Sequence, residues 1–307
     1  MKTSSLTIAM LISGLALGLA TPPAEARVTV VATTQNLAAI AREVAGDRAE
    51  VIGLAPGDQD PHMVEPRPSW VMHLRRADVL VRMGMDLDLW IQGLVDASRN
   101  RRIARGASGD VDASVGIRKL EVPTERLDPS MGHIHVYGNP HYDLDPRNGK
   151  VIARRIMEAL SRADPAGAQV YQANFEDFSR RLDQAVARWQ AQLRPHRGAD
   201  VVVYHKSWAY FFDCFGLRQF AEVEPKPGVP PSPAHAHALI RRMKDAGVGL
   251  ILMESYYPRR FPQMIARETG ARLLEVPVSV RGRRGIETYF DLFDHLVMSV
   301  ARALGEA

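Results

Sequence analysis

Cysteine is almost absent from this sequence of 307 residues: Cys214 is the only one, which excludes an internal disulfide bond. An exported protein without disulfides must be stabilised by its core, and this favours a bacterial periplasm over a small extracellular module. A strong charge of one sign is also absent, since the net charge is +4. Arginines cluster between residues 99 and 105, but no aromatic residues alternate with them, so nucleic-acid binding is not indicated.

Long hydrophobic runs are absent after the first 26 residues. Within that start, Lys2 precedes an apolar stretch over residues 6–20 that is too short to span a membrane comfortably. Ala24-Glu25-Ala26 then supplies small residues at the positions of a cleavage site. These features predict a secretory signal peptide over residues 1–26 and a soluble mature chain. No cysteine follows the cleavage site, so we expect a periplasmic protein without a lipid anchor.

Strand-like and helical patterns alternate along the rest of the chain in two series. The predicted strands are short segments of mainly strand-forming residues, at residues 28–32, 49–54, 79–83, 201–204, 250–253 and 273–276. In the first series, helices are predicted over residues 37–44, after Pro68 and over residues 87–95. The alternation of strands and helices indicates an α/β fold with parallel sheets and helices on both faces.

One long helix is predicted between the two series. From Tyr171 to Leu193, apolar residues recur at steps of three or four, which places them in one stripe along a helix over residues 166–193. At 1.5 Å per residue this helix would span roughly 42 Å, so it can act as a rigid spine between two lobes. We therefore predict a signal peptide, an N-terminal α/β lobe, a linking helix and a C-terminal α/β lobe, over residues 1–26, 27–164, 165–194 and 195–307.

Three histidines stand out by their positions. His62 comes shortly after one predicted strand, His205 follows another directly, and His141 lies in a loop that leads into a helix. In open α/β sheets, ligands bind beyond the carboxyl ends of the strands. Neutral imidazole is the commonest metal ligand, and three imidazoles with one oxygen donor make a tetrahedral zinc site. Short ligand motifs such as HExxH are absent, however, and each histidine taken singly is also explained as a satisfied polar residue.

The segments around these histidines resemble a known family. "DPHMVEPRPS", "GNPHYDLDP" and "YHKSWAYFFDCFGL" are similar to the three histidine motifs of the metal-binding solute receptors that serve zinc and manganese ABC importers. The later "PSPAHAHALIRRMKDAGVGLILMESYYPRR" resembles the C-terminal lobe of the same receptors. The resemblance covers the mature chain and implies two α/β lobes bridged by one long helix. It also implies a metal ion at their interface, a permease in the inner membrane as partner, and a monomeric receptor that is not an enzyme.

The resemblance also bears on the metal and its ligands. Zinc receptors of this family tend to present three histidines, whereas manganese receptors replace one of them with a carboxylate. Since His62, His141 and His205 are all histidines here, we expect zinc, with copper or manganese as alternatives. Many relatives carry an aspartate as fourth ligand where this sequence has Ser279. We expect either Glu254, at the end of a predicted strand, or a water molecule in its place.

Two further histidines and two rival functions stay open at this point. His133 and His135 precede His141 and serve either as accessory zinc ligands or as plain surface residues. A periplasmic zinc hydrolase would need an acid or base beside an open coordination position, a role that Glu65 or Glu254 could take. A manganese receptor or adhesin-like binding protein is the other alternative, and an adhesin would need a surface anchor.

Overall fold

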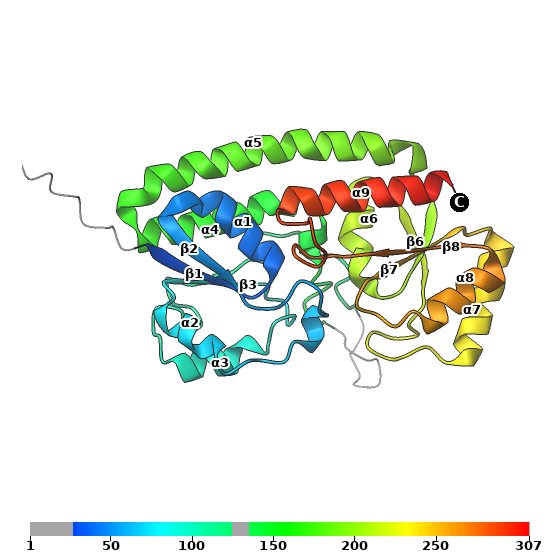
Figure 1. Cartoon of the computed structure of the whole chain (residues 1–307), viewed down its shortest axis with the longest axis horizontal. Helices are drawn as coiled ribbons and strands as arrows, with labels where there is room; N and C mark the ends of the chain where they lie inside the picture. The colour runs from blue at the N-terminus through cyan, green and yellow to red at the C-terminus, as the bar shows by residue number, and fades with distance from the viewer. Residues whose placement is uncertain (1–26, 125–134, 307) are drawn as a thin grey trace, which may run out of the picture.

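The computed structural model describes residues 27–124 and 135–306, which form two lobes side by side, each built on a four-stranded parallel sheet (Figure 1). The predicted α/β fold with two parallel sheets is therefore confirmed. The predicted signal peptide lies outside the described residues. Within the described part of the chain, no helix combines the length and apolar character that a membrane span requires.

The N-terminal lobe has the strand order β2-β1-β3-β4. Its strands are β1 (Val28–Ala32), β2 (Ala49–Gly53), β3 (Val79–Arg82) and β4 (Asp110–Asp112). Its helices are α1 (Gln35–Ala45), α2 (Trp70–Arg76), α3 (Ile91–Ser98) and α4 (Asn148–Ala163).

The C-terminal lobe repeats this arrangement with the strand order β6-β5-β7-β8. Its strands are β5 (Asp200–Val203), β6 (Arg218–Glu222), β7 (Leu250–Glu254) and β8 (Arg272–Val276). Its helices are α6 (Ala209–Phe215), α7 (Pro233–Ala246), α8 (Arg260–Thr269) and α9 (Tyr289–Gly305).

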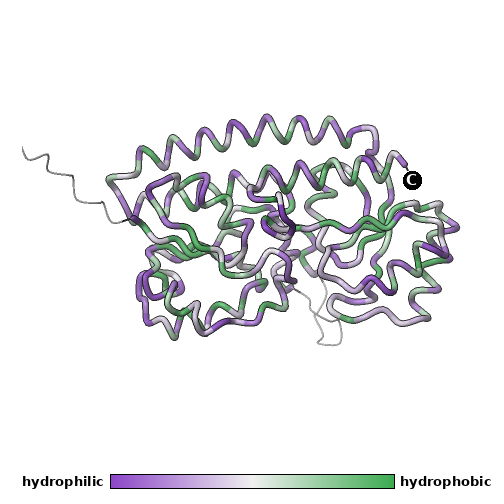
Figure 2. The backbone as a smooth tube through the Cα atoms, in the orientation of Figure 1, coloured by the Kyte–Doolittle hydropathy of each residue, from purple (hydrophilic) through white to green (hydrophobic). Residues whose placement is uncertain are grey.

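Both sheets are covered on both faces, because alternate strand residues point to opposite sides. In β1, Val30 faces the core that includes α1 and α4, while Val31 faces a second core built with α2 and α3. In β5, Val201 and Val203 face the first core and Val202 faces a third core built with α7 and α8. The buried strands appear as hydrophobic segments inside each lobe in Figure 2.

The long helix α5 (Ala168–Leu193) runs along both lobes, with α9 beneath it (Figure 1). The predicted start at residue 166 is close to the observed one. The buried stripe of α5 joins Val30 of the N-terminal sheet and Val201 of the C-terminal sheet in one continuous core. Trp189 of α5 packs on Phe293 of α9 with ring centroids 5.3 Å apart. The lobe boundaries at residues 164 and 195 stay a prediction.

One helix begins later than predicted, and two strands are additional to those predicted. The helix predicted over residues 87–95 begins only at Ile91. The buried carboxylate of Asp88 accepts hydrogen bonds from the backbone N–H groups of Met83 and Gly84, and these bonds hold the residues before the helix in a turn. The strands β4 and β6 were not predicted. Both are edge strands with polar residues, DVD and RQFAE, so they lack the apolar run that marked the central strands.

Candidate metal centre

His62 lies in a single 3-10 turn, Pro61–Met63, which follows β2. Pro61 fixes the first position of this turn, and the Asp60 carboxylate caps it by accepting a hydrogen bond from the His62 N–H at 2.9 Å. The proline ring and the Asp60 hydrogen bond together restrain the backbone of this turn. The imidazole of His62 therefore projects from a backbone with little freedom.

His141 and His205 begin short 3-10 turns in the two lobes. His141 precedes Tyr142–Leu144, and its N–H donates to Asn139 Oδ1 at 3.0 Å. His205 lies two residues after the end of β5 and precedes Lys206–Trp208. Asn139 ties the two segments together, because its Nδ2 also donates to the Lys206 carbonyl oxygen at 2.6 Å.

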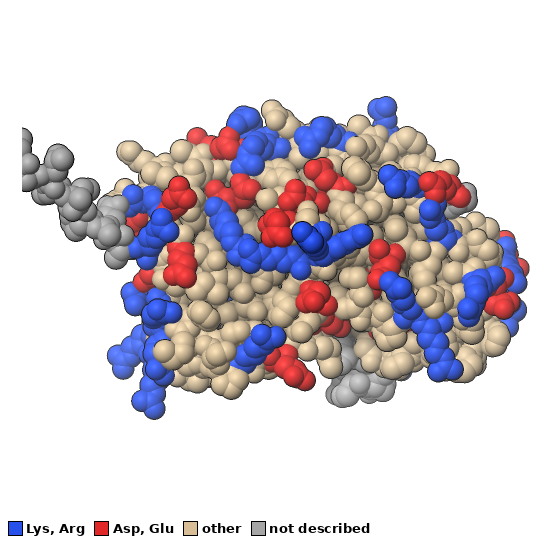
Figure 3. Space-filling model, viewed as in Figure 1, with Lys and Arg blue, Asp and Glu red and all other residues tan. Residues whose placement is uncertain are grey.

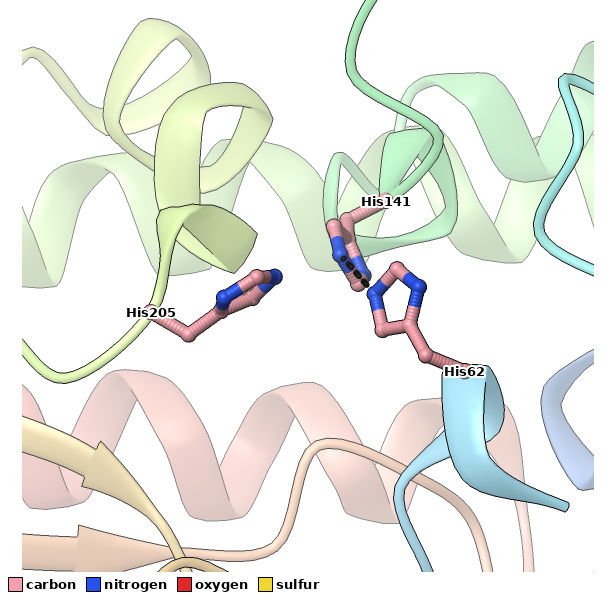
Figure 4. A group of neighbouring side chains, drawn as sticks. All are labelled: His62, His141 and His205. Carbon is pink, nitrogen blue, oxygen red and sulfur yellow. Dashed lines mark hydrogen bonds between the residues drawn. The ribbon is translucent and has the colours of Figure 1, made fainter. Parts of the chain in front are cut away.

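The structure brings the three predicted histidines together (Figure 4). One nitrogen from each of His62, His141 and His205 lies within 4.8 Å of the other two. The Nε2 atoms of His62 and His141 are 3.1 Å apart, and the three ring centroids are separated by 5.0 to 5.6 Å. Ligand atoms of a tetrahedral zinc ion, with bonds of about 2.0–2.1 Å, are separated by roughly 3.4 Å, so a small rearrangement would accommodate one ion.

His141 and His205 are buried and His62 is half-buried, and burial governs the electrostatics of the two buried rings. The side chains of His141 and His205 are 6% and 5% exposed. Burial and the neighbouring imidazoles of His62 and His205 hold the pKa of His141 well below its ordinary value, which keeps this ring neutral. Burial also lowers the pKa of His205, but the hydrogen bond to Glu224 and the charges of Glu254 and Asp60 raise it by more. His141 is thus neutral and ready to bind a late first-row divalent cation, whereas His205 must first give up the proton that its raised pKa favours.

Glu254, the predicted fourth ligand, ends β7 and is completely buried. The group of donor atoms within 4.8 Å consists of the three histidines and does not include its carboxylate. By distance and angle neither of its oxygens has a hydrogen-bond partner within the described residues, although the Ser207 hydroxyl is near enough to lower its pKa slightly. Burial raises the pKa of Glu254 to about 7, and the charge of His205 offsets this only in part. A buried carboxylate without a partner is costly, which is typical of a group reserved for a ligand.

Other residues considered as ligands are distributed around the cluster. The His135 ring lies 5.0 Å from that of His62, so it is adjacent to the site, while His133 lies outside the described residues. Ser279 lines a cavity of about 40 Å³ together with His141 and Asp143. Glu224, whose carboxylate is 2.9 Å from Nδ1 of His205, was not among the predicted site residues. The one available signal was its position at the start of the proline-rich segment 224–233.

The comparison with known proteins gives the family. The model of the ZnuA family, zinc-uptake complex component A, periplasmic, matches residues 30–303. The chain belongs to this family. Its members are metal-binding receptors of ABC importers, so the receptor prediction is confirmed and the hydrolase alternative is wrong.

The proteins that this chain is similar to are not all described with the same metal. The metal ABC transporter substrate-binding lipoprotein SloC of Streptococcus mutans is 26% identical over the full length of both chains. A crystal structure of ZnuA has a TM-score of 0.76 at 23% identity and covers 91% of this chain and all of its own. The Mn²⁺ complex of FpvC from Pseudomonas aeruginosa has the same TM-score at 26% identity and covers 92% of this chain and 99% of its own.

Two conclusions follow for this member of the ZnuA family. It is a metal-binding substrate-binding protein of an ABC importer, and the comparisons include both zinc and manganese proteins. SloC is named a lipoprotein, which gives no support to the expected absence of a lipid anchor, so that absence stays a prediction.

Acidic and basic side chains are interspersed over the face of the molecule in Figure 3, in keeping with the mild net charge.

Proposed function

We propose that this protein captures Zn²⁺ between its lobes through His62, His141 and His205 and delivers it to an ABC importer in the inner membrane. The observation that supports this most directly is the convergence of three histidine nitrogens within 4.8 Å in the interior. Three imidazoles without a carboxylate among them suit zinc better than manganese, which prefers oxygen ligands. The receptor would act as a monomer in the periplasm, after removal of residues 1–26.

The fourth position falls to Glu254 or to a water molecule. Glu254 is the buried carboxylate whose charge acts on His205, and an incoming divalent cation would neutralise a group that otherwise has no partner. A shift of the β7 end toward the histidines would bring its oxygen into the shell. With a water molecule in that position, Glu254 would act on the ion through its charge and not as a direct ligand.

Calorimetry with zinc and with manganese tests this function directly. The wild-type protein should bind one zinc ion tightly and manganese more weakly, and His141→Ala should abolish the tight zinc site. His237→Ala is the matched control, because His237 is an exposed histidine on α7 and the same atoms are removed. Tighter binding of manganese than of zinc would assign the receptor to manganese, and equal losses in both variants would place the metal elsewhere.

A further inference from the structure

Glu224 is brought beside His205 by the pairing of two neighbouring strands. β5 and β6 are parallel, and their register continues beyond the strand ends, where the Val223 N–H donates to Val203 O at 2.8 Å and the Glu224 N–H donates to Tyr204 O at 3.1 Å. The residue that follows Tyr204 is His205. The backbone of Glu224 is therefore fixed next to the ligand loop before its side chain makes any contact.

The Glu224 side chain completes this arrangement. Its Oε2 lies 2.9 Å from Nδ1 of His205, and both side chains are buried, with 7% and 5% of their surface exposed. The Gly228 N–H donates to the same Oε2 at 3.2 Å. An ionised carboxylate can only accept hydrogen bonds, so the proton of this contact belongs to Nδ1 of His205. In the neutral ring, the form that binds a metal ion, the other nitrogen, Nε2, then carries the lone pair.

The surroundings of His205 explain why such a restraint is needed. His205 and Glu224 line a pocket of about 250 Å³ together with His62 and Tyr257. The imidazole therefore borders open space on this side, where the Glu224 contact holds its orientation. The segment that carries Glu224 is stiffened by prolines at 225, 227, 230 and 231 and is closed by a bridge between Lys226 and Val229. The carboxylate is thus presented by a rigid support.

We propose that Glu224 is a positioning residue for metal capture: it fixes the tautomer and orientation of His205 so that Nε2 faces the other two histidines. This rests on the proposed function, because it assigns a role to a residue behind one of the three proposed ligands. A carboxylate behind a ligating histidine also increases the basicity of the ring, which favours binding of zinc. Loss of such a partner typically costs about 10–100-fold in metal affinity.

The test uses two substitutions at this position and one control. Glu224→Ala removes the acceptor, whereas Glu224→Gln keeps an acceptor oxygen of the same reach and removes the charge. Glu222→Gln is the control, because Glu222 lies two residues earlier, pairs with Lys206 at 3.7 Å and carries the same charge. Zinc affinity is measured by competition with a chromophoric chelator, and melting curves of the metal-free variants check that each one folds.

The ring tautomer of His205 is read separately, from two-bond ¹H–¹⁵N correlations of the metal-free protein. We expect the Nδ1–H tautomer in the wild type and in Glu224→Gln, and a mixture in Glu224→Ala. Zinc affinity should fall about 10–100-fold in Glu224→Ala, less in Glu224→Gln, and by less than about twofold in the control. Glu224→Ala with wild-type affinity and tautomer would overturn the proposal, as would an equal loss in Glu222→Gln. A wild-type protein that fails to bind zinc would refute the proposed function instead, while the tautomer still reports on Glu224.

Discussion

Replacing Glu254 with glutamine should stabilise the metal-free protein and weaken its binding of zinc. The carboxylate is completely buried without a hydrogen-bond partner in the described part of the chain, and burial raises its pKa from 4.5 to about 7. At about 1.4 kcal/mol per pKa unit, the difference between these two values costs the folded state about 3 kcal/mol once the group is ionised. Glutamine has nearly the same shape and no charge, so it avoids this cost.

The sign of the pH dependence follows from the raised pKa. Between pH 4.5 and about 7 the folded state retains a proton that the unfolded state has lost, so the free energy of unfolding falls as the pH rises. The cost is absent below pH 4.5 and complete above pH 7. Glu254→Gln should therefore gain about 3 kcal/mol at pH 8 but less than about 1 kcal/mol at pH 5.

Thermal melts after treatment with a chelator measure this gain. For a protein of this size, 3 kcal/mol corresponds to a rise in Tm of roughly 6–12 °C at pH 8. Glu268→Gln, on the exposed surface of α8, is the control and should leave Tm nearly unchanged. The absence of a gain at pH 8 would refute the reasoning, since the buried carboxylate would then carry no unpaired charge.

The same variant decides the fourth ligand. If Glu254 binds the ion, its replacement should weaken zinc binding about tenfold or more, because even the indirect partners of metal ligands contribute that much. A full gain in stability together with unchanged zinc affinity would assign the fourth position to water. A gain in stability together with weaker zinc binding would show that Glu254 lowers the stability of the metal-free protein but serves as a ligand.

Three further predictions follow from the site. Free zinc at about 1,000 times Kd should stabilise the wild-type protein by about 4 kcal/mol, which is measured as a higher Tm. The Tm of His205→Ala should rise little, and a rise equal to that of the wild type would place the metal elsewhere. The ring of His135 lies 5.0 Å from that of His62, but His135→Ala should leave tight binding of one zinc ion largely intact in calorimetry. Loss of the tight site would place His135 among the ligands. Bound zinc should be released progressively below about pH 6.5 in a chelator competition, because imidazole must be neutral to bind, and retention down to pH 4 would contradict a site made of histidines.

The convergence of the three histidines could be anticipated because it depends on a general property of parallel sheets. His62 follows β2 and His205 follows β5, and the carboxyl ends of parallel strands in each lobe meet at one edge. The long helix α5 was also predictable, because its apolar stripe persists over many turns. Both features can be predicted because each depends on a pattern of neighbouring residues that is long enough to identify a strand or a helix.

The contacts that support the histidines could not be anticipated in the same way. Glu224 reaches His205 only because the edge strand β6 pairs with β5, and β6 has no apolar run that identifies it as a strand. Asn139 joins the segments of His141 and His205, which are far apart in sequence. Such contacts depend on which strands become neighbours, and a single sequence contains no local signal of that choice.

The way the lobes are joined limits how the ion can leave. Asn36 of α1 is 2% exposed, and its amide donates to Val278 O at 3.1 Å and accepts from the Val280 N–H at 2.8 Å, across the two lobes. Separating the lobes would replace these hydrogen bonds by bonds to water, at a net cost of about 0.5–1.5 kcal/mol each, and would also split the core shared through α5. The exposed pair between Asp213 and Arg118 contributes less, since surface ion pairs are worth about 0–1 kcal/mol. A wide hinge opening is therefore the costly route, and release is expected to proceed through small tilts of the lobes and a short displacement of the His62 turn as one unit.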